Sequence, residues 1–222
     1  MTTFRIAVIG GTGPQGKGLA YRWARHGHEV VIGSRSAEKA VATAHEVADR
    51  VAAEGGAPVV SGATNAEAAG GAEVVVLAVP YAGHDELVAS LAGELAGKIV
   101  VSCVNPLGFD KAGPYGLDIE GSAAESAAAL VPEATVVGAF HHVSAVSLWS
   151  DAEYLDHEDV LVCGDSAEGK EIAQELARSV TSRIGIDAGS LRLARQLEPL
   201  TAVLISINKN YKVRSGIRIS GL

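Results

Sequence analysis

The chain contains 222 residues with a formal net charge of −8, and 48% of its residues are apolar. That length fits one α/β domain with a modest extension, or two small domains, and the apolar content is enough for a buried sheet. The acidic balance, without a run of Lys or Arg, excludes nucleic acid and anionic membrane as general partners. No apolar run is long enough to span a membrane, and no signal peptide precedes the first strand-like segment, so we expect a soluble, cytoplasmic protein.

The first predicted strand, residues 4–9, leads into a glycine-rich turn in which Gly11, Gly13 and Gly16 fit the pattern G-x-G-x-x-G. The pattern alone is weak, but here it follows an apolar strand and precedes a helix predicted at residues 14–26. We expect Gly11 to permit the tight turn, Gly13 to let a pyrophosphate approach the backbone, and Gly16 to let the helix pack closely on the strand. The helix N-terminus then offers N–H groups and a positive dipole end to phosphates. An ordinary glycine-rich turn is the alternative.

The end of the second predicted strand carries Ser34 and Arg35, with Lys39 one helical turn further on. A site for NAD usually has Asp or Glu here, about 20 residues after the glycines, to bind the ribose 2′-hydroxyl. A hydroxyl, a guanidinium and an ammonium together suit a 2′-phosphate instead. We therefore predict NADP(H) as the dinucleotide; the alternative is that Arg35 and Lys39 are solvated surface charges.

Strand-like and helix-like segments alternate well beyond this unit. Further strands are predicted at residues 29–33, 58–61, 73–79, 98–104 and 135–140. Further helices are predicted at residues 36–53, 83–95 and 122–130, with a short one opened by a capping box at Thr64 and Glu67. Residues 105–120, rich in Gly and Pro, are predicted to form a loop. This alternation predicts an α/β protein with a Rossmann-type, doubly wound parallel sheet.

The carboxyl ends of the central strands are where such sheets bind ligands. Val79 ends one predicted strand and Pro80 follows it, and Asn105 follows the next strand, so we expect these residues to line the nicotinamide half of the cofactor. The alternative is that the prolines simply end the strands. His141 and His142 follow the strand at residues 135–140. A metal pair is improbable because adjacent side chains on a strand point in opposite directions. A general acid, a hydrogen-bond donor to a bound ring and a structural role stay open.

The C-terminal part, residues 146–222, is predicted to be a small α/β extension that packs on the NADP-binding Rossmann domain, residues 1–145. Its strands are predicted at residues 159–163 and 184–186, and its helices at residues 166–180 and 191–208. The last helix is too apolar for a free surface helix, so we expect it to pack on the Rossmann domain or across the twofold axis of a homodimer. Residues 209–218 form the one basic cluster of the chain, either a frayed end or a contact for an anionic ligand tail.

The cysteines and the remaining histidines indicate no metal site. Cys103 and Cys163 lie in apolar strand-like runs, and we expect them to be buried reduced thiols. The other histidines are predicted to be surface residues: His26, His28, His45, His84 and His157.

The absence of several catalytic motifs limits the reactions that we expect the chain to catalyse. The chain has no GxSxG, HExxH or Walker lysine pattern and no Tyr-x-x-x-Lys pair. Hydride transfer to a carbonyl usually needs a proton donor, whereas transfer between two conjugated rings needs mainly stacking, distance and orientation. The scarcity of acid–base candidates therefore favours transfer between two rings.

The ordered set of motifs resembles the family of F420-dependent NADP reductases, which pass hydride between NADP and a 5-deazaflavin coenzyme. The motifs are Gly10-Gly11-Thr12-Gly13, Gly16-Lys17-Gly18-Leu19-Ala20, Val31-Ile32-Gly33-Ser34-Arg35 with Glu38-Lys39, Val162-Cys163-Gly164-Asp165, Asp187-Ala188-Gly189, Arg195, Glu198, Thr201 and a C-terminal Gly-Ile-Arg stretch. The resemblance covers nearly the whole chain. It implies an oxidoreductase with NADP(H) and coenzyme F420 as its small-molecule substrates.

The resemblance also implies roles for individual residues. Thr12, Ser34, Arg35 and Lys39 would bind NADP, His141 and the Val143 backbone would lie by the deazaflavin ring, and Arg195 and Thr201 would support the shared pocket. The full set of expected coenzyme contacts is Gly11, Thr12, Gly13, Gln15, Gly16, Ser34, Arg35, Lys39, Val79, Pro80, Asn105, His141, Val143, Arg195 and Thr201. Two alternatives stay open: an NADPH-dependent reductase of a flavin, ferric chelate or small carbonyl, and a non-catalytic NADP-binding sensor.

Overall fold

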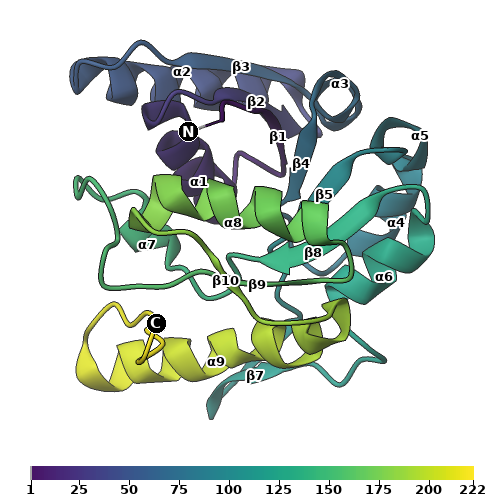
Figure 1. The fold of residues 1–222 in the computed structure, drawn as a ribbon, viewed down its shortest axis with the longest axis vertical. Coiled ribbons are helices and arrows are strands. Elements are labelled where there is room, and N and C mark those ends of the chain that lie inside the picture. The colour runs from purple at the N-terminus through teal and green to yellow at the C-terminus, as the bar shows by residue number, and fades with distance from the viewer. Residues whose placement is uncertain (1) are drawn as a thin grey trace.

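The computed structural model describes residues 2–222 and contains an eight-stranded sheet with helices on both faces (Figure 1). The strand order is β3-β2-β1-β4-β5-β8-β9-β10, and all neighbours from β3 to β8 pair in parallel. This is the order of a Rossmann sheet. Strands β2 and β3 are added on one side of β1, and strands β4, β5 and β8 are added on the other side, so the topological switch point lies between β1 and β4. The predicted doubly wound α/β fold is therefore confirmed.

The strands and helices have the following bounds. The strands of the large sheet are β1 (Arg5–Ile9), β2 (Glu29–Ser34), β3 (Val59–Thr64), β4 (Val74–Leu77), β5 (Ile99–Ser102), β8 (Thr135–Ala139), β9 (Leu161–Gly164) and β10 (Ile186–Asp187). The helices are α1 (Pro14–Arg25), α2 (Ala37–Ala53), α3 (Asn65–Gly71), α4 (His84–Ser90), α5 (Ala92–Leu95), α6 (Ala123–Leu130), α7 (Ala145–Leu148), α8 (Ala167–Thr181) and α9 (Ala194–Tyr211). A 3-10 turn, Leu191–Leu193, precedes α9.

Two apolar cores lie on the two faces of the sheet. Alternate residues of a strand point to opposite faces, so in β1 Ile6 and Val8 join one core while Ala7 and Ile9 join the other. The first core also contains the inner faces of α1, α2 and α8, and the second contains those of α3 to α6. Because both faces are covered, the central strands are mostly apolar, with Arg5 at the start of β1 and Ser102 at the end of β5, as expected for a parallel sheet.

The start of α3 agrees with the sequence prediction, whereas one predicted helix is divided in two. Thr64 and Glu67 form a full capping box at the start of α3. The predicted helix at residues 83–95 instead breaks at Leu91 into α4 and α5.

The C-terminal part continues the same sheet rather than forming a sheet of its own. β9 pairs with β8 in an antiparallel direction, which the prediction of a parallel sheet missed, and β10 then pairs with β9 in parallel. Residues 105–120 also contain more structure than the predicted loop, because β6 (Leu107–Asp110) and β7 (Gly113–Gly116) form an antiparallel hairpin. A Cβ on Gly116 would lie 2.7 Å from the Cβ of Pro199, so this hairpin packs directly on α9 (Figure 1).

Two histidines predicted to lie at the surface are buried. His28 is 3% exposed; its Nδ1 accepts from the Phe4 backbone N–H (3.2 Å), and its Nε2 lies 3.2 Å from the Ser179 hydroxyl. His84 is 1% exposed, and its Nδ1 lies 2.7 Å from Asp85 Oδ1. His45 and His157 are exposed as predicted. The prediction failed for His28 because its partner Ser179 is 151 residues away in the chain.

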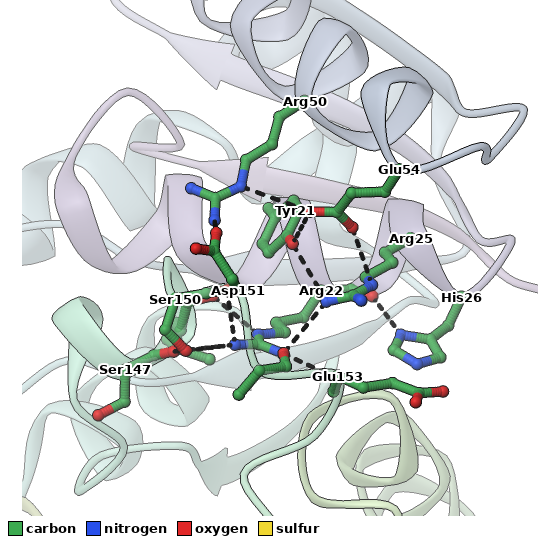
Figure 2. A network of polar contacts seen from close by, with 12 residues as sticks. Tyr21, Arg22, Arg25, His26, Arg50, Glu54, Ser147, Ser150, Asp151 and Glu153 are labelled. Carbon is green, nitrogen blue, oxygen red and sulfur yellow. Dashed lines mark hydrogen bonds and ion pairs between the residues drawn. The ribbon is translucent and has the colours of Figure 1, made fainter.

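A buried arginine fixes the segment that follows β8. The Arg22 side chain of α1 is fully buried, and its guanidinium points toward the end of α7 and the loop that follows it, residues 147–153 (Figure 2). Nε donates to the Leu148 carbonyl (2.7 Å) and Nη2 to the Ser147 carbonyl (2.9 Å). Nη1 donates to the carbonyls of Ala152 (2.5 Å) and Glu153 (2.9 Å). The bonds to Ser147 and Leu148 satisfy carbonyls at the C-terminus of α7, where a cation is also favoured by the helix dipole, and the bonds to Ala152 and Glu153 hold the loop that follows.

Candidate functional site

A cavity of about 510 Å³ lies at the carboxyl edge of the sheet, between the start of α1 and the inner face of α9. Its lining comes from the segments that follow β1, β4, β5 and β8, which is where open α/β sheets bind ligands. The lining residues are Gly13, Pro14, Gln15, Ala78, Val79, Pro80, Cys103, Asn105, His141, His142, Val143, Ser144, Ala145, Val146, Thr201, Leu204, Ile205, Asn208 and Ser215.

The glycine turn forms one end of this cavity. Gly10 has the left-handed conformation that the tight turn requires (φ 74°), so the conformational role predicted for Gly11 belongs to its neighbour. Gly11 is required for another reason: a Cβ there would lie 2.7 Å from the Val8 carbonyl oxygen. A Cβ on Gly16 would lie 2.8 Å from the Gly11 Cα, whereas a Cβ on Gly13 would meet only the Gly10 carbonyl at 3.5 Å. Gly13 therefore leaves open space above the turn.

The N-terminus of α1 is suited to a phosphate. Its N-cap residue is Gly13, and no side chain caps it, whereas a Ser or Thr hydroxyl caps α2, α3, α6 and α8. Such an end presents N–H groups and the positive end of the helix dipole to an anion. Thr12 and Pro14 also line a smaller cavity beside it.

The end of β2 lies next to the glycine turn. The Gly11 N–H donates to the Gly33 carbonyl (3.0 Å), which joins the turn to the strand that carries Ser34. Ser34 is buried and its Oγ accepts from the Ser36 N–H (3.3 Å), while Arg35 and Lys39 are exposed. No carboxylate ends this strand, so the structure places a hydroxyl and two cations beside the predicted phosphate site.

The end of β8 has an unusual backbone. Phe140 is fully buried and has a φ of 62°, which is rare for a residue with a bulky side chain. Its ring packs edge-on against Trp23 (centroids 5.6 Å apart), and its carbonyl accepts from Gln15 Nε2 (3.3 Å). Strained conformations of this kind persist where surrounding contacts fix them, and they are common at functional sites. Here the strain turns the chain sharply into the segment that lines the cavity.

The His141 ring is buried at the edge of the cavity. It is 2% exposed, and a Cβ on Gly138 would lie 3.0 Å from its Nε2, so the ring packs against β8. Neither ring nitrogen has a hydrogen-bond partner among residues 2–222. Burial lowers the pKa of His141 to about 3. The ring is therefore neutral near pH 7 and has no imidazolium proton to donate as an acid.

The backbone of His141 makes the contacts that organise the site. Its carbonyl accepts from Asn105 Nδ2 (2.8 Å) and from Thr201 Oγ1 (2.7 Å), which are themselves 3.2 Å apart. These bonds join the ends of β5 and β8 to α9. The Asn105 Oδ1 atom is buried and has no partner among residues 2–222. It is thus an acceptor available to a hydrogen-bond donor on a ligand.

Arg195 is not part of this cavity. It forms a bidentate pair with Glu125, through Nε (2.8 Å) and Nη2 (2.7 Å), beside a second pocket of about 270 Å³. The neighbouring Glu198 is 1% exposed, and its carboxylate accepts from the backbone N–H groups of Ala123 (2.8 Å) and Ala124 (3.0 Å) at the start of α6. Burial raises the pKa of Glu198 to about 7, although these two hydrogen bonds act in the opposite direction. The structure therefore separates Arg195 from Thr201, which were predicted to share one pocket.

Sequence reasoning missed a row of residues on α9. Thr201, Leu204, Ile205 and Asn208 all line the cavity, with the spacing i, i+3, i+4 and i+7 that marks one face of a helix. Only Thr201 was predicted, although the same spacing could have indicated the other three. Cys103, which also lines the cavity, is 6% exposed, and burial raises the pKa of its thiol to about 12.

The cavity lining contains no Asp, Glu, Lys or Arg. Its two histidines are buried, and burial lowers the pKa of both. Among residues 2–222, no group of three His, Cys, Asp or Glu side chains could hold a metal ion, and no helix there is long and apolar enough to cross a membrane. Such a neutral lining can bind and orient uncharged rings, and it contains no carboxylate, ammonium or guanidinium group that could act as an acid or a base.

Comparison with known proteins agrees with this geometry. Residues 5–106 match the family described as NADP oxidoreductase, coenzyme F420-dependent. The chain is 41% identical over 225 aligned residues, covering 98% of this chain and 95% of the relative, to the F420-dependent NADP reductase of Methanothermobacter thermautotrophicus strain Delta H. The chain belongs to the F420-dependent NADP reductase family. The predicted family is thereby confirmed.

Two further comparisons identify a solved structure with the same fold and a longer protein with a related segment. A crystal structure from Arthrobacter sp. FB24, provisionally assigned as an F420-dependent NADP reductase, superimposes with a TM-score of 0.80 at 32% identity and covers 98% of this chain and 99% of its own. The metalloreductase STEAP3 of Rattus norvegicus is 33% identical over 201 residues, which is 90% of this chain but only 37% of that protein.

Proposed function

We propose that this protein transfers hydride between NADP(H) and the deazaflavin coenzyme F420. When both are bound, C4 of the nicotinamide and C5 of the deazaflavin supply the redox chemistry. The observation that carries the proposal is the neutral cavity at the carboxyl edge of the sheet in a chain of this family. Transfer between two rings needs a dry, shaped space more than it needs reacting side chains.

The residues present fit NADP at the glycine turn. The uncapped start of α1 and the close approach allowed at Gly13 suit the pyrophosphate. Arg35 and Lys39 would pair with the 2′-phosphate, with Ser34 beside them, and Val79 and Pro80 would border the nicotinamide. Thr12 in the turn and Gln15 at the start of α1 would add contacts to the phosphates.

The residues on the α9 side fit a second ring. Rather than lining the nicotinamide half as the sequence predicted, the unpartnered Asn105 Oδ1 would accept a hydrogen bond from an N–H of this second ring, and the backbone at Val143 would border the ring. Thr201 would act by holding the His141 carbonyl, and through it the segment that borders the ring. Arg195 would act at a distance, since its pair with Glu125 ties α9 to α6. No residue of the chain is assigned as an acid or a base.

The test is a spectrophotometric assay of purified protein with NADPH and oxidised F420. We expect the deazaflavin absorption band to bleach with NADPH and to stay nearly unchanged with NADH. FMN and a ferric chelate serve as parallel acceptors. Turnover of these acceptors without bleaching of F420 would replace the proposal with a reductase of another acceptor. Tight NADPH binding without turnover of any acceptor would indicate a sensor.

We also propose that the protein is a cytoplasmic homodimer in which residues 146–222 complete the F420 pocket and contribute to the interface. Exposed apolar side chains support an interface on the hairpin and α9: Phe109 is 68% exposed, Tyr115 46% and Val203 53%. Light scattering coupled to gel filtration measures the assembly. A dimer that dissociates on a Phe109→Glu substitution would support this interface, and a monomeric wild type would contradict it.

A further inference from the structure

The C-terminal end of α9 and the residues after it form a basic segment at the rim of the cavity. This basic segment, residues 209–214, connects Asn208 and Ser215, both of which line the cavity. The Ser215 N–H donates to Asn208 Oδ1 (2.6 Å), and the Ser215 hydroxyl donates to the Leu204 carbonyl (3.3 Å). The segment is therefore attached at both ends to the wall of the cavity.

Three cations of the basic segment point to solvent without acidic partners. Lys209, Lys212 and Arg214 are exposed, and none of them forms an ion pair with a residue in the range 2–222, whereas the nearby Arg218 pairs with Asp159 at 3.7 Å. The chain as a whole has a formal net charge of −8, so this positive cluster is opposite in sign to the net charge of the molecule. The cavity beside them has no charged residue, so any charged part of a ligand must extend beyond the cavity wall.

The two ends of the cavity therefore offer positive potential in different ways. At the glycine turn it comes from the start of α1, and at the other end it comes from side chains alone. The C-terminus of α9 is the negative end of its dipole, so the peptide groups there do not attract an anion. Any anion bound at this end depends on Lys209, Lys212 and Arg214.

We propose that the basic segment is a subsite for the anionic chain of coenzyme F420, the phosphodiester and glutamyl carboxylates that extend from its deazaflavin ring. The inference rests on the proposed function, because it assumes that F420 occupies the α9 side of the cavity. With the ring in the part of the cavity that Asn105 and the inner face of α9 line together, the chain would leave the cavity at Asn208 and Ser215 and meet the three cations. The contacts are exposed, so they contribute affinity that decreases with salt concentration.

Binding measured by the fluorescence anisotropy of the oxidised deazaflavin tests the subsite. The variant carries Lys209→Gln, Lys212→Gln and Arg214→Gln together. The control is Arg192→Gln, an exposed cation beyond the opposite end of α9, about 25 Å away along the helix. The probes are F420 with its full glutamyl chain, the deazaflavin with only its ribityl group, and NADPH.

We expect the triple variant to bind full-length F420 roughly fivefold to tenfold more weakly than the wild type at low salt. Its affinity for the ribityl fragment and for NADPH should not change, and the control variant should match the wild type with all probes. Unchanged affinity for F420, or an equal loss for the fragment, would overturn the subsite. A loss confined to NADPH would do the same by assigning the cations to the phosphates of NADP.

The assay separates the failure of the subsite from the failure of the proposed function. If the wild type binds F420 more tightly than the fragment and the variant does not, but NADPH never reduces the bound deazaflavin, the subsite stands and the proposed reaction is wrong. If the wild type reduces F420 and the variant binds it unchanged, the reaction stands and the subsite is wrong. Absence of F420 binding to the wild type would overturn both.

Discussion

Replacement of Arg22 by Met removes the bonds that hold the segment after β8 to α1 (Figure 2). The Leu148 carbonyl is buried and would lose the donor that Arg22 Nε supplies at 2.7 Å. An unpaired buried carbonyl costs about 1–3 kcal/mol, and each hydrogen bond from a charged donor contributes about 1.5–3 kcal/mol. The carbonyls of Ala152 and Glu153, which are exposed residues, can turn to water instead. Met also avoids the desolvation of a buried cation, so we expect a net loss of about 2–4 kcal/mol.

Equilibrium unfolding in urea measures this loss for Arg22→Met as a lower midpoint. Arg22→Lys should lose less, because an ammonium keeps the charge but not the planar set of donors. The control is Arg178→Met, whose partner Glu175 is 2.8 Å away on the surface of α8, and we expect a change below about 0.5 kcal/mol. The segment that Arg22 holds lines the cavity through Ser144, Ala145 and Val146, so the KM for F420 should rise more than the KM for NADPH. A loss below about 1 kcal/mol would show that water replaces the arginine and would refute the reasoning.

Three further predictions concern single side chains. Arg35→Ala should weaken NADPH binding by about 1–3 kcal/mol and leave NADH nearly unaffected in calorimetric titrations; an equal loss for both would remove Arg35 from the 2′-phosphate site. Burial raises the pKa of Glu158 from 4.5 to about 7, so the folded state binds this proton more tightly, and stability falls as pH rises between these values. Glu158→Gln should remove that slope, worth about 3 kcal/mol above pH 8, from urea midpoints measured at pH 5 to 8; an unchanged slope would contradict it. Ser182 ends α8 with a φ of 62°, so Ser182→Gly should raise the free energy of unfolding by about 0.5–1 kcal/mol, and a lower melting temperature would count against this strain.

Local patterns were sufficient to predict most of the sheet. The apolar runs at β1, β4 and β5 are buried on both faces, and a continuous apolar run of this length is enough to predict a buried strand. Strand direction has no such signal, because alternating side chains look the same in both directions. The antiparallel β9 was therefore missed. The hairpin of β6 and β7 was also missed because Gly, Pro and the exposed Phe109 do not form an alternating apolar pattern.

The candidate site likewise has one half that the sequence predicts and one half that it does not. The glycine turn and the end of β2 belong to one β-α-β unit with a known sequence pattern, so their residue types predict the site for NADP directly. The other half joins Asn105, His141 and Thr201, which are separated by 36 and 60 residues. Spacing alone gave no reason to place Thr201 on the cavity and Arg195 away from it. That distinction depends on the rotation of α9 about its own axis, and the contacts that hold this rotation come from distant segments: Pro199 packs on the hairpin, and Glu198 accepts from the start of α6.

The arrangement implies that this protein acts through position more than through charge. The His141 carbonyl is fixed by donors from β5 and α9, Phe140 is held in a strained conformation, and Arg22 fixes the segment that follows. Three independent sets of contacts therefore determine where the backbone beyond β8 lies, although none of them brings a charged group into the cavity. A hydride moves only over a short and well-directed distance, so rigidity at this boundary has a direct effect on rate. Substitutions that loosen Phe140 or Thr201 should accordingly lower kcat, even though neither residue exchanges a proton with a substrate.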